Sequence, residues 1–136
     1  MGGSEEVKRE GPTVLLVEDD PDARCLLRDI LTDNGFVVET AANGADAILA
    51  LDEQAPPTVM LIDLLMPGVV GQELLEFIAS EERFSSIHIG IVSGSPELAP
   101  KGYRLFPKPL NVAPLLEFVR EGCEKRQHAA DGPPAS

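Results

Sequence analysis

The sequence predicts an α/β fold, a single domain whose central sheet contains five parallel strands. Short, wholly apolar runs suit strands that are buried on both faces of a sheet, and they alternate along the chain with segments of helical periodicity. Strands that alternate with helices run parallel, because each helix carries the chain back across the sheet. The length of 136 residues fits one domain, which buries enough apolar surface to fold without disulfides or metals.

The first predicted strand is the apolar run 14–17, and three acidic residues follow it. The last of them, Asp20, suits the N-cap of a helix that has Pro21 at its first position and ends at Gly35. The same two signals, an apolar run and a helical stripe, predict the remaining elements. These are strand 36–40, a helix from Gly44 that stops at Pro56, strand 59–62, helix 72–80, strand 87–92, strand 103–106 and helix 112–125.

This order of elements fits a flavodoxin-like, doubly wound sheet with the strand order 2-1-3-4-5. The crossover between the fourth and fifth strands, residues 94–103, has only ten residues and contains Pro96 and Pro100. A complete strand-helix-strand crossover needs at least about 10–12 residues. The sequence therefore predicts that the fourth helix is shortened or missing.

Polar side chains follow four of the five predicted strands, at the edge where ligands bind in such sheets. They are Glu18, Asp19, Asp63, Ser93 and Lys108. Three carboxylates in one crevice raise each other's pKa, and a divalent cation removes that penalty. Oxygen ligands favour Mg²⁺, with Mn²⁺ as an alternative, over zinc.

The composition excludes several classes of function. There are 23 acidic and 11 basic residues, so the net charge is −12, which argues against binding to nucleic acid or to an anionic membrane. No apolar run approaches the roughly 20 residues of a membrane span, and the N-terminus lacks the apolar stretch of a signal peptide. Two cysteines, Cys25 and Cys123, make no disulfide framework, so we expect a cytoplasmic protein.

The four motifs together resemble the receiver domain of two-component response regulators. They are Leu16-Val17-Glu18-Asp19-Asp20, Asp63-Leu64-Leu65-Met66-Pro67-Gly68 with Gly71, Ser93, and Lys108-Pro109. We expect the receiver domain to occupy residues 13–124, between a flexible leader at 1–12 and a disordered tail at 125–136, with no output domain in this chain.

The resemblance implies a role for each residue. Asp63 is the expected phosphoacceptor, Ser93 the switch hydroxyl, and Lys108 a positive charge for the phosphoryl oxygens, on a peptide that is often cis in the family. The expected metal ligands are Glu18, Asp19 and Asp63, together with the backbone carbonyl of Leu65.

The resemblance also implies partners. The phosphoryl group would come from a histidine kinase or a histidine phosphotransfer protein, which in the family meets the first helix, here at Arg24 and Arg28. The chain would then be a switch and not an enzyme, assisting only its own phosphorylation and dephosphorylation. The downstream target and oligomeric state stay open.

Two departures from the family keep an alternative open, a protein-interaction module that does not depend on phosphorylation. One is the short crossover at 94–103. The other is Leu105, which stands where receivers commonly carry an aromatic switch residue.

Overall fold

The fold is described here from a computed structural model, which describes residues 13–63, 68–95 and 99–131. Five strands form one parallel sheet in the order β2-β1-β3-β4-β5. Their bounds are β1 (Thr13–Val17), β2 (Val37–Ala41), β3 (Val59–Asp63), β4 (His88–Ser93) and β5 (Arg104–Pro107). The predicted topology is therefore confirmed.

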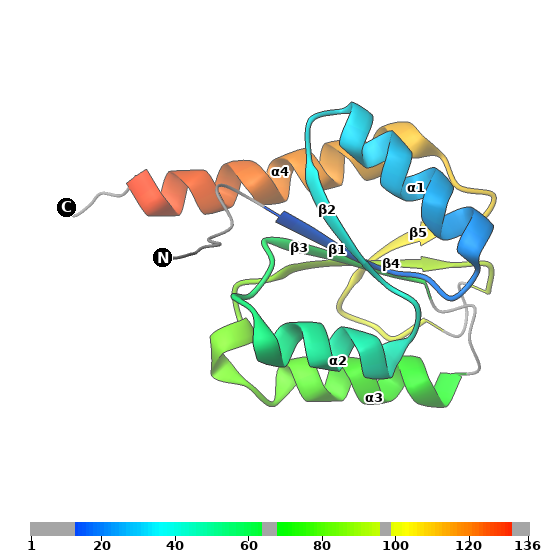
Figure 1. Cartoon of the computed structure of the whole chain (residues 1–136), viewed down its shortest axis with the longest axis horizontal. Helices are drawn as coiled ribbons and strands as arrows, with labels where there is room; N and C mark the ends of the chain where they lie inside the picture. The colour runs from blue at the N-terminus through cyan, green and yellow to red at the C-terminus, as the bar shows by residue number, and fades with distance from the viewer. Residues whose placement is uncertain (1–12, 64–67, 96–98, 132–136) are drawn as a thin grey trace, which may run out of the picture.

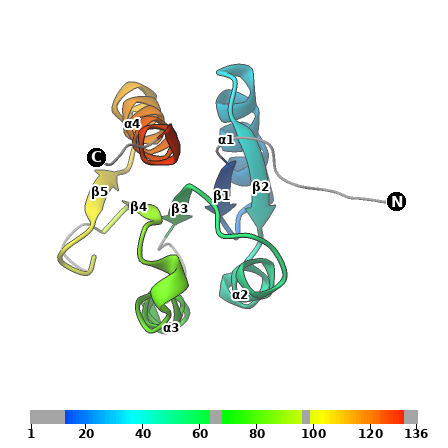
Figure 2. The same cartoon turned by 90° about the vertical axis from the view of Figure 1, so that its left-hand side faces the viewer.

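Helices cover both faces of the sheet, as Figure 1 and the end-on view in Figure 2 show. One face carries α1 (Pro21–Asp33) and α4 (Val112–Asp131), and the other carries α2 (Gly44–Glu53) and α3 (Gly68–Ala79). A short 3₁₀ turn, η2 (Glu82–Phe84), follows α3. The helices thus form the outer two of three layers.

The strand side chains alternate between two apolar cores, one on each side of the sheet. Leu15 and Met60 belong to the core beneath α2 and α3, whereas Leu16 and Leu61 belong to the core beneath α1 and α4. All residues of β1 and β3 are buried, because these central strands are covered on both faces. This rigid centre ends at the strand tips that carry the predicted site.

Local signals in the sequence explain where the first two helices begin. The Asp20 side chain accepts a hydrogen bond from the backbone N–H of Ala23 at the start of α1. The Asn43 side chain accepts one from the backbone N–H of Asp46 at the start of α2. After α1 the chain reverses at Gly35, whose φ of +92° is readily adopted only by glycine.

The largest differences from the predicted helix boundaries are at the start of α3 and at the end of α4. The helix α3 begins at Gly68 instead of Gln72, and it contains Gly71 despite the low helix propensity of glycine. The helix α4 continues past Lys125 to Asp131, through a segment rich in strong helix formers. The prediction of a disordered tail at 125–136 is therefore wrong for residues 126–131, which continue the helix.

The connection between β4 and β5 lacks a helix in its described part, residues 94–95 and 99–103. The expectation of a shortened or missing fourth helix agrees with this, although residues 96–98 lie outside the described part. Among the described residues, the sheet face beside α3 therefore has one helix fewer than a complete alternation would supply.

Candidate functional site

The candidate site lies where the strands end, because parallel strands bring their carboxyl ends to one edge of the sheet. Asp63 is the last residue of β3 and Ser93 the last residue of β4. Glu18 follows β1 directly, and its backbone N–H donates to the carbonyl oxygen of Ala41 at the end of β2. The central strands thus fix the backbone from which each of these side chains projects.

Two carboxyl groups and one ammonium meet at this edge. Glu18 and Asp63 are 1% and 2% exposed, so both are almost removed from solvent. The Nζ of Lys108 lies 2.7 Å from Oδ2 of Asp63, and the lysine side chain is 28% exposed. One ammonium therefore faces two buried acids.

This arrangement raises the pKa of Glu18 from its ordinary value of 4.5 to about 8. Burial is the largest cause, followed by the hydrogen bond with Asp63 and the negative charge of Asp63. The backbone N–H of Asp20, 3.0 Å from Oε2 of Glu18, and the charge of Lys108 act in the opposite direction. Burial beside Asp63 thus favours the protonated form of Glu18, and an added cation would favour its ionised form.

Asp19 lies apart from this buried pair. Its side chain is exposed where the chain leaves β1 for α1. Among the described residues, no three His, Cys, Asp or Glu side chains lie close enough to form a metal-binding cluster. The structure therefore brings together Glu18, Asp63 and Lys108, with Asp19 next along the chain on the solvent side.

Ser93 and Lys108 are joined through their backbones. The N–H of Lys108 donates to the carbonyl oxygen of Ser93 across 3.0 Å, and the Lys108–Pro109 peptide is cis. The Ser93 hydroxyl oxygen accepts the backbone N–H of Ser95, also at 3.0 Å. In this structure the buried hydroxyl is thus engaged with its own loop.

Three further predictions concern residues near the site or along its supporting elements. The predicted carbonyl ligand, Leu65, lies outside the described residues. Leu105 is partly buried and packs against the core beneath α2 and α3. Cys25 is exposed and Cys123 is buried, and both are free thiols, as the sequence predicts.

One residue at the site has a contact that its sequence position alone did not indicate. The Nη1 of Arg24, in α1, donates to the backbone carbonyl oxygen of Glu18 across 2.9 Å. The resemblance to receiver domains implies for Arg24 only a contact with the phosphodonor partner. Asp20 caps the helix that contains Arg24, so this helix begins next to the end of β1. That proximity is the sequence feature that could have indicated a contact between Arg24 and the backbone of Glu18.

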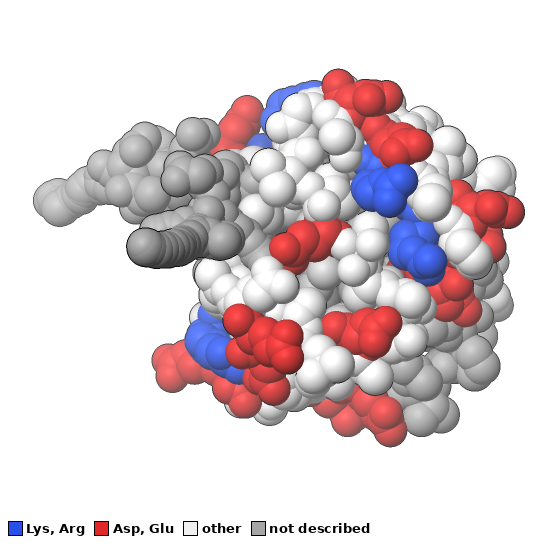
Figure 3. All heavy atoms as spheres, in the orientation of Figure 1, with Lys and Arg blue, Asp and Glu red and all other residues white. Residues whose placement is uncertain are grey.

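Acidic side chains dominate the face of the molecule seen in Figure 3, where the few basic groups lie among them. This agrees with the net charge of −12. In the described part of the chain, no helix has the length and apolar character needed to cross a membrane.

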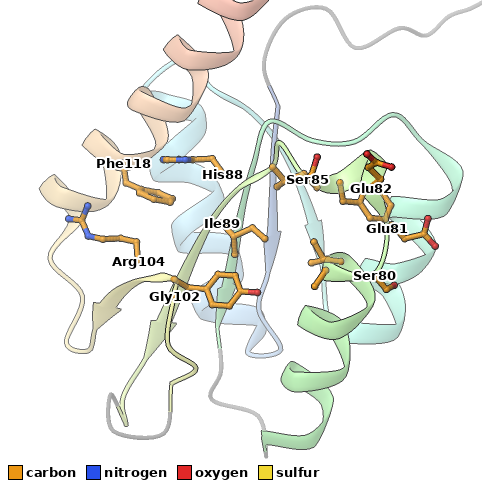
Figure 4. A pocket seen from close by; sticks show the side chains of 14 residues that line it. Ser80, Glu81, Glu82, Ser85, His88, Ile89, Gly102, Arg104 and Phe118 are labelled. Carbon is orange, nitrogen blue, oxygen red and sulfur yellow. The ribbon is translucent and has the colours of Figure 1, made fainter.

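A groove of about 750 Å³ lies away from the candidate site, at the amino-terminal ends of β4 and β5. Figure 4 shows His88, Phe118 and Arg104 on one side of it and Glu81 and Glu82 on the other. The ring of His88 stacks on Phe118 with centroids 4.1 Å apart. The groove therefore has a mixed lining and does not include the strand-end carboxylates.

Comparison with known proteins decides the family. The sequence profile described as "Response regulator receiver domain" matches residues 14–104, more than half of the chain. The chain belongs to the response regulator receiver domain family. The flavodoxin-like sheet is therefore that of a receiver domain, in which the crossover between β4 and β5 is short.

Similar curated proteins include both kinases and regulators. The receiver is 37% identical to the sensor histidine kinase TmoS of Ectopseudomonas mendocina over 92 residues, which are 68% of this chain and 9% of that protein. It is 43% identical to the transcriptional regulatory protein AfsQ1 of Streptomyces coelicolor over 63 residues, 46% of this chain and 28% of that protein. The chain thus spans less than half the length of these relatives.

Solved structures support the same fold. The receiver domain of the Francisella response regulator 1452 has a TM-score of 0.72 at 21% identity, covering 85% of this chain and 99% of that chain. The response regulator TrrA of Thermotoga maritima, solved in complex with Mg²⁺ and BeF, has a TM-score of 0.71 at 23% identity, covering 82% of this receiver and 98% of that chain.

Proposed function

We propose that this receiver domain is a phosphoryl-accepting switch, modified on Asp63 by a histidine kinase or a histidine phosphotransfer protein. The observation that carries the proposal is the buried group of Glu18, Asp63 and Lys108 at the strand ends. Because most aspartates lie on the surface, a 2% exposed aspartate paired with a lysine is a candidate for chemistry.

The reaction we propose is a phosphoryl transfer between two side chains. A carboxylate oxygen of Asp63 attacks the phosphorus of a phosphohistidine, so that an O–P bond forms while the P–N bond breaks. The leaving imidazole nitrogen takes up a proton. Lys108, already 2.7 Å from Asp63, offers its ammonium to the negative charge on the phosphoryl oxygens.

Two of the expected ligands, Glu18 and Asp63, lie together and fit a divalent cation, whereas the Asp19 side chain is exposed next to them along the chain. The carboxyl oxygens of Glu18 and Asp63 are buried beside a single lysine ammonium, and oxygen donors are those that Mg²⁺ or Mn²⁺ prefers. Glu18, Asp19 and Asp63, with the carbonyl of Leu65, would hold the ion. When bound, it would supply positive charge to the carboxylate and phosphoryl oxygens.

Ser93 would report the modification. Its hydroxyl now accepts the N–H of Ser95, and phosphoryl oxygens on Asp63 would offer it a stronger, charged acceptor. Turning toward them would release the N–H of Ser95 and change the loop after β4. The domain would assist only this phosphoryl transfer and the later hydrolysis of the phosphoryl group from Asp63. It would not turn over other substrates.

The test is incorporation of ³²P from labelled acetyl phosphate in the presence of Mg²⁺. Wild-type protein should take up label that hydroxylamine releases, because hydroxylamine cleaves acyl phosphates. The Asp63→Asn variant should take up none, whereas Asp46→Asn, a change at an exposed aspartate, should label normally. An unlabelled wild type, with no response to beryllofluoride in amide NMR spectra, would instead support the phosphorylation-independent interaction module.

A further inference from the structure

The turn between β1 and α1 is tied down on both sides of Asp19. The carbonyl of the peptide before Asp19 belongs to Glu18, and it accepts the Nη1 of Arg24 at 2.9 Å. The N–H of the peptide after it belongs to Asp20, and it donates to Oε2 of Glu18 at 3.0 Å. Both peptide planes that flank Asp19 are therefore fixed by side chains.

The guanidinium supplies a hydrogen bond that the sheet does not. The registers of β1 with β2 and with β3 both end at Val17, so the Glu18 carbonyl lies one residue past the last paired position. A backbone carbonyl at the end of a buried strand needs a donor. Arg24, which is half-buried in α1, provides one from six residues along the chain.

We infer that Arg24 is a positioning residue, which orients Asp19 for divalent-cation binding by fixing the Glu18–Asp19 peptide. The inference rests on the proposed function, because it takes Asp19 to be a metal ligand. An exposed carboxylate has many orientations available, and each one that the backbone excludes lowers the entropy lost when the ligand is immobilised. Arg24 would thus act through Asp19 without touching the ion.

Electrostatic repulsion alone predicts the opposite effect of removing Arg24 on Mg²⁺ affinity, so a binding measurement can distinguish the two explanations. Arg24 carries a permanent positive charge beside a site for a cation, so removing that charge should tighten Mg²⁺ binding if charge were all that mattered. If the hydrogen bond to the Glu18 carbonyl matters more, removing Arg24 should weaken binding. Loss of residues that orient metal ligands typically costs about 10–100-fold in metal affinity.

The experiment measures Mg²⁺ dissociation constants by amide NMR titration of the unphosphorylated protein with magnesium chloride. For Arg24→Gln we expect binding at least about tenfold weaker than wild type. Arg28→Gln is the matched control, because Arg28 lies one turn further along α1, is exposed and pairs only with the neighbouring Asp29 among the described ion pairs. It removes the same charge and should not weaken binding.

Arg24→Lys separates positioning from general damage to the fold. A lysine can donate one hydrogen bond to the same carbonyl, so it should recover part of the affinity lost in Arg24→Gln. In the acetyl phosphate reaction, the loss should appear in the Mg²⁺ concentration needed for half-maximal labelling, with little change in the rate at saturating Mg²⁺. If Arg24→Gln does not fold, Arg24→Lys alone should still bind Mg²⁺ more weakly than Arg28→Lys.

Equal or tighter Mg²⁺ binding in the Arg24 variants would overturn the inference and leave the proposed function intact. Equal weakening in the Arg28 control would overturn it as well, because the effect would then not depend on the hydrogen bond. If the wild type binds no Mg²⁺, the metal-binding part of the proposed function is wrong, and so is the inference that depends on it.

Discussion

Replacing Glu18 with glutamine should change how the stability of the metal-free receiver depends on pH. Glutamine has the shape of a protonated glutamate, and its carbonyl can still accept the N–H of Asp20. Its amide can donate toward Asp63, as the neutral carboxyl does. The substitution therefore preserves the contacts of the protonated side chain while removing its titration.

The magnitude follows from the pKa of Glu18, which rises from 4.5 to about 8 in the folded protein. Because the folded pKa lies above the unfolded one, the contribution to stability is complete below pH 4.5 and is lost as the pH rises to about 8. Each pH unit in this interval is worth about 1.4 kcal/mol. The wild type should thus lose up to about 5 kcal/mol relative to Glu18→Gln between these limits.

The assay is urea unfolding in EDTA at whole pH values from 5 to 9, with the two proteins compared at each pH. The difference in unfolding free energy should grow with pH up to about pH 8 and then level off. Glu73→Gln makes the same chemical change at an exposed position of α3 and should not reproduce this growth. A difference between wild type and Glu18→Gln that stays constant with pH would refute the reasoning.

Three further changes test the supporting structure. Asp20→Ala removes the cap of α1 and should lower the unfolding free energy by about 1 kcal/mol in urea titrations, and an unchanged value would show that the cap contributes nothing. His88→Leu should gain thermal stability relative to the wild type as the pH falls from 7.5 to 5. Burial, followed by the charge of Lys125, lowers the pKa of His88 below 6.5, so the contribution of this histidine to wild-type stability falls as the pH drops through 6.5, and a difference between the two proteins that does not change with pH would contradict this. Gly122→Ala places a methyl group 2.7 Å from both Cδ2 of His88 and Cγ2 of Val59. Overpacking costs about 1–3 kcal/mol and should outweigh the roughly 1 kcal/mol gained in helix propensity, so a rise in the midpoint of urea unfolding would be the contrary result.

The sequence predicted the sheet well because its signals are local. A strand such as 59–63 is wholly apolar until its last residue, and that pattern places both its burial and the position of Asp63. Glycines and helix-forming residues gave weaker signals for where helices begin and end. The start of α3 at Gly68 and the continuation of α4 to Asp131 depend on context that single-residue propensities do not contain.

The residues of the candidate site were predicted from the sequence, but the exposure of one of them and one supporting hydrogen bond were not. Strand order indicated that Glu18, Asp63 and Lys108 would share an edge, and the structure places them together. The exposure of Asp19 and the hydrogen bond from Arg24 depend on the path of the chain after β1, which alternation of apolar residues does not determine.

The described residues of the connection between β4 and β5 form no helix, and this has a consequence for the edge of the sheet. β5 is the outermost strand on that side, and a long, flat outermost strand invites pairing with another polypeptide. This strand has only four residues, begins with the charged Arg104 and ends with Pro107, which has no N–H to offer. The receiver can therefore dispense with a covering helix there without exposing a template for fibril growth.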